Sequence, residues 1–411
     1  MIKLLQNFKT SNTLFYDFLY ALLTAFLFSF FIYADYFGFT FKILNTLFAI
    51  SSLTLFLYAS KRSILIAGYL IGLLWFYWIG YSFEYQGVGY MTPVITLAFG
   101  FIYMLFFGVL ALSKKVYIRA ILLFALSYFE PFDWNWLQIE LIFIHSYIGI
   151  YKYQFFLVLL GLSLPAYIKK PFTFLPLLFI LLALNIQTQP QDLSTLKIKL
   201  VATDIKQEDK WLPQNRTKII KMIYTQIDLA IQEKYDVVVL PETIFPLFMN
   251  AHLSLRNTLL KRSLKITIIA GALLKEKGRN FNVTYMFNEG KYTLAKKMVL
   301  VPFGEYIPLP DFARKIINET FFSGLSDFVQ AKNPTDFIIK GQKFRNAICY
   351  EATCQEIYEG DVKFVIVTSN NAWFAPSIEP TIQNLLLRFY ARKNHVTIYH
   401  AANYKGTGII K

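Results

Sequence analysis

Three reactive side chains stand at the ends of apolar runs that have the composition of β-strands. Glu242 follows the run DVVVL, Lys297 ends the run that begins at Tyr292, and Cys349 ends the run that begins at Phe344. Each has an ordinary explanation when taken singly, because a strand-ending cysteine is often a small buried hydrophobe and the charged residues often cap strands in solvent. Together, however, they comprise a nucleophile, a carboxylate and a cation.

Acyl transfer through a thioester requires these three groups at one site. Cysteine attacks as the thiolate, and the free thiol has a pKa of about 8.5, so a nearby base or cation must favour its ionisation. A carboxylate can accept the thiol proton, and an ammonium can stabilise both the thiolate and the oxyanion that forms during attack. Glu242, Lys297 and Cys349 could supply these roles.

The elements that must position these residues are predicted from hydrophobic periodicity beyond Leu196. Helical spacing is present in 213–233 and 380–393. The predicted strands are Leu196–Ile205, Asp236–Leu240, Ile266–Ala270, Asn282–Phe287, Tyr292–Lys297, Phe337–Ile339, Phe344–Cys349, Val362–Ser369 and Val396–Ala402. Strands mixed with helices indicate an α/β sandwich for residues 196–411.

The first half of the chain has a different composition. The whole sequence is 55% hydrophobic and only 16% charged, an excess that requires a membrane. Long apolar runs predict a polytopic transmembrane domain over 1–190 with about seven helices, although six or eight also fit. The predicted spans are Leu14–Ile32, Ile43–Tyr58, Ile64–Phe83, Val94–Leu112, Val116–Tyr128, Phe155–Ile168 and Phe172–Ile186.

Basic residues fall in alternate loops of this half, whereas the intervening loops carry acidic residues. The positive-inside rule therefore places the N-terminus in the cytoplasm, and seven crossings place everything after Gln187 outside. The predicted topology is therefore a multi-pass anchor that holds an extracytoplasmic catalytic half. Whether the helices only anchor that domain or also shape the substrate site is left open by the sequence.

The motifs LPET, KKMVLVPFGEYIP and NAICYE, in that order, resemble the nitrilase (carbon-nitrogen hydrolase) superfamily. With a membrane bundle before them, they resemble the bacterial apolipoprotein N-acyltransferase family. The string LVPFGEYIP, whose glutamate lies eight positions after Lys297, is the most specific motif, and SNNAWF and HAANYKGTGII add support. The resemblance implies an α-β-β-α nitrilase-like sandwich joined to an α-helical transmembrane bundle. It also implies a multi-pass protein of the bacterial inner membrane whose catalytic domain faces the periplasm.

The resemblance also implies residue roles. Glu242 would be the general base, Lys297 the transition-state stabiliser and Cys349 the nucleophile. Residues expected to support the site are Glu305, Tyr350, Glu351 and Trp211. For Trp211, simple packing of an amphipathic segment is an equal alternative.

The implied reaction is ping-pong. Cys349 takes an acyl chain from a membrane phospholipid, and the thioester passes it to the free amine of diacylglyceryl-cysteine at the start of an apolipoprotein, the last step of bacterial lipoprotein maturation. The partners are thus a phospholipid donor, an apolipoprotein acceptor and membrane lipid, with the enzyme acting as a monomer and without a cofactor. A membrane-tethered amidase or nitrilase, or a non-catalytic lipid- or lipoprotein-binding member, is the alternative.

Two apolar segments beside the catalytic residues match a lipid substrate. One contains Phe245 and Phe248, and the other contains Phe321 and Phe322. We expect these segments to be mobile arms that dip into the lipid and admit acyl chains. The alternative is that they are loops packed into the core.

Other function classes have little support. The net charge of +15 comes from scattered basic residues rather than one tract, so anionic lipid is a likelier counter-charge than nucleic acid. Cys349 and Cys354 cannot build a disulfide framework, and the four histidines form no metal-ligand pair, so no metal is expected. His400, within an apolar strand, is expected to be a core residue.

The sequence departs from the resembled family at two places. Asn371 stands where the family usually has aspartate, which is expected to weaken one interaction without disabling the site. The chain also stops at Lys411, where the family normally continues with further strands and a last transmembrane helix. Absence of those strands would leave a sheet edge open.

Overall fold

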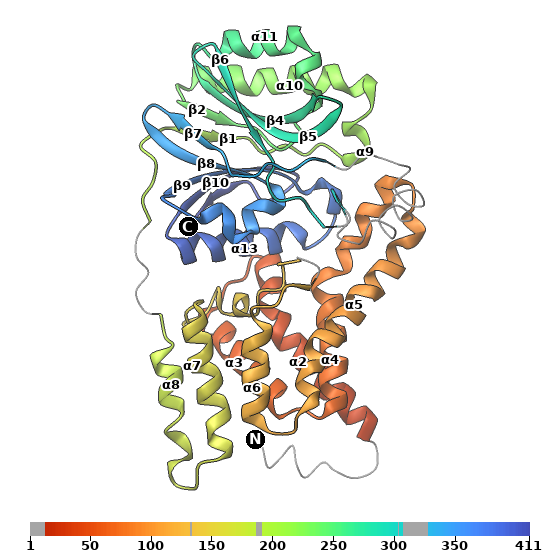
Figure 1. The fold of residues 1–411 in the computed structure, drawn as a ribbon, viewed down its shortest axis with the longest axis vertical. Coiled ribbons are helices and arrows are strands. Elements are labelled where there is room, and N and C mark those ends of the chain that lie inside the picture. Colours follow the sequence, from red (N-terminus) through yellow and green to blue (C-terminus); the bar gives the residue numbers. More distant parts are fainter. Residues whose placement is uncertain (1–12, 132–133, 186–190, 303, 307–327) are drawn as a thin grey trace. The chain divides into compact units, whose positions relative to one another are not determined.

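The computed structural model of the chain describes residues 13–131, 134–185, 191–302, 304–306 and 328–411 (Figure 1). The chain forms two compact units. Unit 1 comprises Met1–Gly80, Tyr90–Phe129 and Leu137–Thr188, and unit 2 comprises Tyr81–Gly89, Glu130–Trp136 and Gln189–Lys411. Two short segments from the apolar half therefore belong to unit 2. We call the second of them, Glu130–Trp136, the tryptophan segment.

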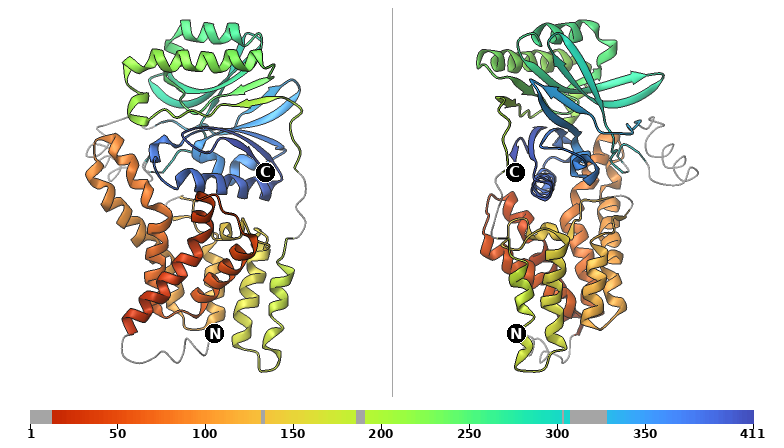
Figure 2. Two further views of the ribbon diagram at one scale, coloured as in Figure 1. Left: turned by 180° about the vertical axis from the view of Figure 1, so that it is seen from behind. Right: turned by 60° about the vertical axis from the view of Figure 1, so that its left-hand side comes forward.

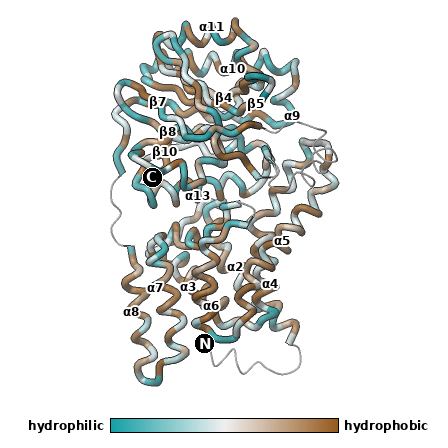
Figure 3. The backbone as a smooth tube through the Cα atoms, in the orientation of Figure 1, coloured by the Kyte–Doolittle hydropathy of each residue, from teal (hydrophilic) through white to brown (hydrophobic). Residues whose placement is uncertain are grey.

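Unit 1 has helices in all seven ranges where the sequence predicts spans. Three of them, Thr13–Tyr36, Lys61–Tyr85 and Gly89–Leu112, are long and apolar enough to cross a membrane. Among the described residues of this unit, the α-helices are α2 (Thr13–Tyr36), α3 (Lys42–Tyr58), α4 (Lys61–Phe76), α5 (Thr92–Gly108), α6 (Val116–Leu126), α7 (Lys152–Ser163) and α8 (Leu177–Leu182). Figure 3 shows the apolar character of these helices. How many of them cross the bilayer stays a prediction.

Glycines allow α4 and α5 to pack closely. A Cβ atom added at Gly68 would lie 2.6 Å from the carbonyl oxygen of Tyr103, and one at Gly72 would lie 2.5 Å from that of Phe99. Small residues at helix contacts are typical of membrane bundles. Large apolar side chains face outward from the same bundle, where lipid can cover them. On α2 and α5 these are Leu14, Phe15, Phe18, Leu19, Leu22, Leu23, Phe26, Val94, Leu97, Phe101 and Leu105.

Unit 2 is built on two sheets. The six-stranded sheet has the order β1-β2-β4-β5-β6, with β3 paired to β4; β1, β2 and β4 are parallel, and β4, β5 and β6 are antiparallel. The strands are β1 (Ile198–Leu200), β2 (Val237–Val239), β3 (Phe245–Phe248), β4 (Thr267–Glu276), β5 (Arg279–Asn288) and β6 (Lys291–Lys296).

The five-stranded sheet has the order β11-β10-β9-β8-β7, in which β8, β9 and β10 are parallel and the two outer strands are antiparallel to their neighbours. Its strands are β7 (Asp336–Ile339), β8 (Gln342–Ile348), β9 (Phe364–Asn370), β10 (Thr397–Asn403) and β11 (Gly408–Ile410). All nine predicted strands are present, several with shifted ends, whereas β3 and β11 were not predicted.

Helices cover the outer faces of both sheets. Helices α10 (Pro213–Gln232) and α11 (Leu253–Arg262) lie against the six-stranded sheet, and α13 (Glu379–Asn394) lies against the five-stranded sheet (Figures 1 and 2). One core lies between α10, α11 and the first sheet, and another, which includes Val239, Ile366 and Tyr399, lies between the sheets. The predicted α-β-β-α sandwich is therefore confirmed. Helix α11 was not predicted.

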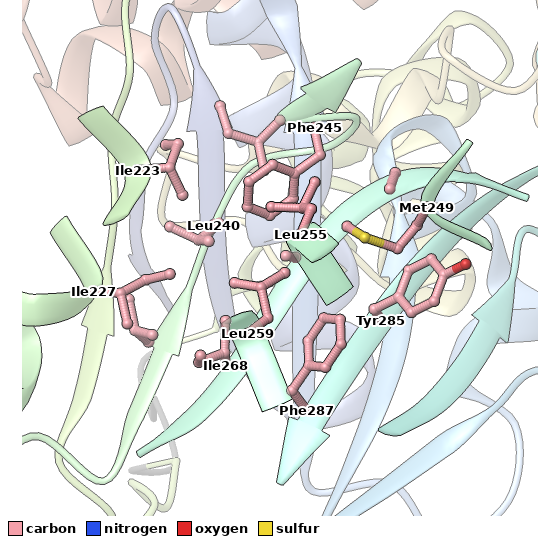
Figure 4. Packing of buried hydrophobic residues seen from close by; sticks show 14 of the residues in the cluster. Ile223, Ile227, Leu240, Phe245, Met249, Leu255, Leu259, Ile268, Tyr285 and Phe287 are labelled. Carbon is pink, nitrogen blue, oxygen red and sulfur yellow. The ribbon is translucent and has the colours of Figure 1, made fainter. Parts of the chain in front are cut away.

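The first segment that we expected to be a mobile arm is instead part of this fold. Phe245 is fully buried in β3 and packs in one core cluster with Met249, Leu240 and Leu255 (Figure 4). The arm interpretation is wrong for Phe245, because its apolar side chain pairs with the sheet core rather than with solvent or lipid. Phe248, at the end of β3, is half-buried. Phe321 and Phe322 lie outside the described residues.

Candidate active site

Glu242 lies in the tight turn between β2 and β3 and is buried, with 7% of its surface exposed. The next residue, Thr243, has a positive φ of 43°, a conformation that costs free energy for a residue with a branched Cβ. β4 approaches this turn closely at Gly271, where an added Cβ would lie 2.3 Å from the backbone nitrogen of Thr243. Only glycine leaves room for the turn, which aims the carboxylate into the site.

Lys297 directly follows β6 and is 1% exposed, contrary to the usual surface position of a strand-ending lysine. Its Nζ lies 2.7 Å from Oε2 of Glu305 and 3.9 Å from Oε1 of Glu242. Nδ2 of Asn282, on β5, donates to Oε1 of both carboxylates, at 2.7 Å for Glu242 and 3.2 Å for Glu305. Val301 N also donates to Glu305 at 2.9 Å. One ammonium and one amide thus hold two carboxylates side by side.

Cys349 begins a short 3₁₀ helix (Cys349–Thr353) at the end of β8 and has a positive φ of 54°. Such strained backbone at a strand exit turns the side chain out of the sheet. Nε2 of Gln383, on α13, donates to its Sγ at 3.7 Å, and Oε1 of Gln383 accepts from Nδ2 of Asn371 at 2.9 Å. An aspartate at 371 has no hydrogen to donate, so Asn371 orients the Gln383 amide.

The charges of Glu242 and Lys297 both act on the Cys349 thiol. Burial raises the pKa of the Cys349 thiol well above its ordinary value, and the negative charge of Glu242 adds to this while Lys297 opposes it. Burial acts to lower the pKa of Lys297, but the carboxylates of Glu305 and Glu242 outweigh it and raise that pKa. At neutral pH the site therefore holds a neutral thiol and a buried ammonium.

Glu351 joins β8, the strand that precedes Cys349, to the loop after Lys297. Its Oε2 accepts from the backbone nitrogens of Met298 (2.7 Å) and Val299 (3.2 Å), and its Oε1 accepts from that of Ile348 (2.6 Å). Burial raises the pKa of Glu351 to about 7, although Lys297 and these three donors act to lower it. The side chain orients its neighbours rather than the substrate.

The tryptophan segment packs against Tyr350, the residue that follows Cys349. The rings of Trp134 and Trp136 stack on the ring of Tyr350, with centroids 5.4 and 6.2 Å away, and Nε1 of Trp136 donates to Oγ1 of Thr353 at 2.9 Å. Tyr350 is 2% exposed. Neither tryptophan was predicted from the sequence to lie at the site. The pattern WNW in an otherwise irregular stretch was the available signal.

Trp211 is 40% exposed and follows the short helix α9 (Gln207–Lys210). The residue before it, Lys210, is fully buried, and its Nζ donates to the backbone oxygen of Glu242 at 3.1 Å. Trp211 is thereby tied by its neighbour to the Glu242 turn, although no contact of its own with the triad is present in the described residues. Lys210 was not predicted as a site residue, because a lysine in the polar segment QEDKW is expected to lie at the surface.

His400 is fully buried on β10, with its Nε2 2.8 Å from Oγ of Ser369. Burial lowers its pKa to about 4, so it stays neutral at physiological pH. The prediction of a core residue is confirmed. No group of three or more histidine, cysteine or acidic side chains with the arrangement of a metal site occurs among the described residues.

Comparisons with known proteins agree with this geometry. Residues 15–186 match the family described as the apolipoprotein N-acyltransferase integral membrane domain. The chain is 42% identical over 395 residues to an apolipoprotein N-acyltransferase of Wolinella succinogenes, with 95% of both chains covered. A relative of the same name from Helicobacter hepaticus is 35% identical, covering 90% of this chain and 94% of its own.

The chain belongs to the apolipoprotein N-acyltransferase family. The resemblance stated from the sequence motifs is thereby confirmed, and the chain is a bacterial membrane acyltransferase.

Solved structures match the chain at low similarity. A CN-hydrolase superfamily protein from Xanthomonas campestris is 15% identical with a TM-score of 0.40, covering 51% of this chain and 76% of its own. An amidase of Nesterenkonia is 15% identical with a TM-score of 0.37, covering 53% of this chain and 81% of its own. The fold assignment rests on the two sheets and their helices.

Proposed function

We propose that the protein transfers an acyl chain from a membrane phospholipid to the N-terminal amine of diacylglyceryl-cysteine in apolipoproteins, through a thioester on Cys349. The observation that carries this proposal is the buried Lys297 ammonium, which lies 2.7 Å from Glu305 and 3.9 Å from Glu242 and whose charge acts on the Cys349 thiol. It occurs in a chain of the apolipoprotein N-acyltransferase family.

In the first half-reaction, Glu242 accepts the thiol proton as Sγ of Cys349 attacks the ester carbonyl of the phospholipid. The carbonyl oxygen becomes an oxyanion, which the Lys297 ammonium stabilises. When the intermediate collapses, the carbon–oxygen bond breaks and the proton on Glu242 passes to the departing alcohol. A lysophospholipid leaves, and the acyl chain remains on sulfur as a thioester.

In the second half-reaction, the neutral amine of the diacylglyceryl-cysteine attacks the thioester carbonyl. Glu242 accepts the amine proton, Lys297 again stabilises the oxyanion, and the carbon–sulfur bond breaks. The thiol recovers its proton from Glu242, and the product is an amide. Because an α-amino group has an ordinary pKa of about 7.7 to 8.0, this step should accelerate as the pH rises toward 8.

Glu305 positions Lys297 and Glu242, Glu351 fixes the loop that follows Lys297, and Tyr350 holds the nucleophile turn against the tryptophan segment. Trp211 is proposed to contact substrate, because its side chain is exposed. Alternating basic and acidic loops support a multi-pass protein of the inner membrane with unit 2 in the periplasm, and the enzyme is proposed to act as a monomer.

The test is N-acylation of a diacylglyceryl-cysteine peptide by purified full-length protein in detergent with phospholipid. Cys349→Ala should abolish transfer, whereas the matched variant Cys354→Ala, which removes the other thiol of the chain, should retain it. Mass spectrometry of the peptide measures the product. Transfer by Cys349→Ala at the wild-type rate would rule out the mechanism.

A further inference from the structure

Lys210 is a second buried cation near the catalytic residues, and the mechanism above does not use it. Its side chain is 0% exposed, which is rare for lysine because the charged form loses its hydration on burial. Such a residue persists only where other groups replace the lost water. It stands on α9, one position before the exposed Trp211.

The contacts of Lys210 converge on the turn that carries the base. Its Nζ donates to the backbone oxygen of Glu242 at 3.1 Å and to Oγ1 of Thr243 at 2.9 Å. The Asn370 amide can lie in two orientations. In one, its Nδ2 donates to Oε1 of Gln207 and its Oδ1 accepts from Nδ2 of Asn403; in the other, its oxygen lies 3.1 Å from Nζ of Lys210 and 3.2 Å from Nε1 of Trp373, where it is a third acceptor for the ammonium. All three hydrogens of the ammonium can then be satisfied.

These hydrogen bonds from Lys210 can stabilise the strained backbone of the turn. Thr243 has a positive φ of 43°, and the ammonium binds both its hydroxyl and the carbonyl that precedes it. A charged donor to a backbone oxygen stabilises more than a neutral one. Lys210 is therefore placed to hold the peptide between Glu242 and Thr243 in the orientation that the base requires.

Lys210 also adds charge where anions form. Burial lowers its pKa to about 8, while Glu242 and Cys349 act in the opposite direction, so the ammonium is charged at pH 7 and lies within the electrostatic range of both. The charges that act most strongly on the Cys349 thiol are those of Glu242, Lys297, Glu379 and Glu305, so the contribution of Lys210 is a smaller one. Lys297 is closely paired with Glu305, which offsets part of its charge.

We propose that Lys210 is a positioning residue of the acyl-transfer site: its ammonium fixes the Glu242–Thr243 turn and its charge favours the Cys349 thiolate that forms during attack. This inference rests on the proposed function for its meaning in catalysis. The effect on the thiol, however, is a property of the site without any substrate, and it can be measured separately.

The experiment measures alkylation of Cys349 by iodoacetamide at pH 7.0 in the full-length detergent-solubilised protein, with peptide mass spectrometry to separate Cys349 from Cys354. Lys210→Met and Lys210→Gln remove the charge and should slow alkylation about threefold or more, because an opposite charge nearby shifts a thiol pKa by a sizeable fraction of a unit. Lys210→Arg should stay closer to wild type. The control Lys221→Met removes an exposed lysine of α10 and should have no effect.

The sign of the change separates this role from a merely structural one. A loosened site would expose the thiol and speed alkylation, whereas loss of a favourable charge slows it. The same neutral variants should form the thioester at least about tenfold more slowly, as expected for a lost charged hydrogen bond to the turn. Wild-type rates of both alkylation and thioester formation in a folded neutral variant would overturn the proposal.

If neither neutral variant folds, Thr243→Val provides the test, since it removes one acceptor and keeps the charge. Thioester formation should slow about threefold or more while alkylation at pH 7.0 stays unchanged. A wild-type rate of thioester formation in this variant would overturn the positioning role. If the wild-type protein itself formed no thioester, the proposed function would fail, whereas the alkylation comparison would still test the effect of Lys210 on the thiol.

Discussion

Replacing Glu305 by glutamine should slow thioester formation strongly without unfolding the protein. Nζ of Lys297 lies 2.7 Å from Oε2 of Glu305 and 3.9 Å from Glu242, and these side chains are 1%, 14% and 9% exposed. Without the charge of Glu305, the ammonium pairs with Glu242 alone. The base then binds the cation more tightly and accepts the thiol proton less readily, so the attack by Cys349 slows.

The size of the effect follows from the distance. Coulomb's law with an effective dielectric constant of about 20 gives roughly 6 kcal/mol for unit charges 2.7 Å apart, which is an upper bound. Hydrogen bonds to charged groups contribute about 1.5–3 kcal/mol in practice. Because about 1.4 kcal/mol corresponds to a factor of ten in rate, Glu305→Gln should lower the rate of thioester formation roughly 10- to 150-fold.

The assay is single-turnover labelling of Cys349 with a fluorescent phospholipid, followed by gel detection of the acyl-enzyme. The matched control is Glu276→Gln, which neutralises a carboxylate 2.5 Å from Lys296 at the surface of the same sheet. Exposed ion pairs contribute little, so that variant should label at the wild-type rate. Labelling by folded Glu305→Gln within threefold of wild type would refute the reasoning.

Three further predictions follow from the geometry. Gly271→Ala should lower the rate of thioester formation at least tenfold, since its Cβ would lie 2.3 Å from the backbone of Thr243 and displace the Glu242 turn; unchanged labelling would contradict the need for glycine. Glu351→Gln should also slow labelling, because an amide cannot accept from all three backbone donors. Burial raises the pKa of Glu351 from 4.5 to about 7, so the folded state binds its proton more tightly than the unfolded state does. The resulting contribution to the free energy of unfolding is fully present below pH 4.5 and is lost as the pH rises through 7. The melting temperature of wild type should therefore fall between pH 5 and pH 8 by more than that of Glu351→Gln, and equal falls would contradict this.

The regular elements of unit 2 could be predicted because their periodicity is strong. The run DVVVL is buried on both faces of β2, and α10 carries isoleucines at helical spacing that face the sheet. The segment after Glu242 could not be predicted in this way. Its apolar residues, Phe245 among them, fit an exposed lipid-binding arm as well as a strand by composition, and only pairing with β4 decides between these.

The proposed triad could be selected from the sequence through its motifs, whereas the residues that contact it could not. The contacting residues lie on three separate elements: Asn282 on β5, Gln383 on α13 and Lys210 on α9. No local sequence pattern predicts that these elements come together. The tryptophan segment is a further case, since its neighbours in sequence belong to unit 1 while its rings pack on Tyr350. Long-range contacts of this kind depend on the topology of the whole sandwich.

The most direct test of the central claim is a pulse-chase through Cys349. The full-length protein in detergent is first labelled with a fluorescent phospholipid, the excess lipid is removed, and a diacylglyceryl-cysteine peptide is then added. The label should leave Cys349 at the rate at which it appears on the amine of the peptide, and a peptide with a blocked amine should leave the thioester intact. Label that stays on Cys349 while new peptide is acylated from added phospholipid would contradict the mechanism.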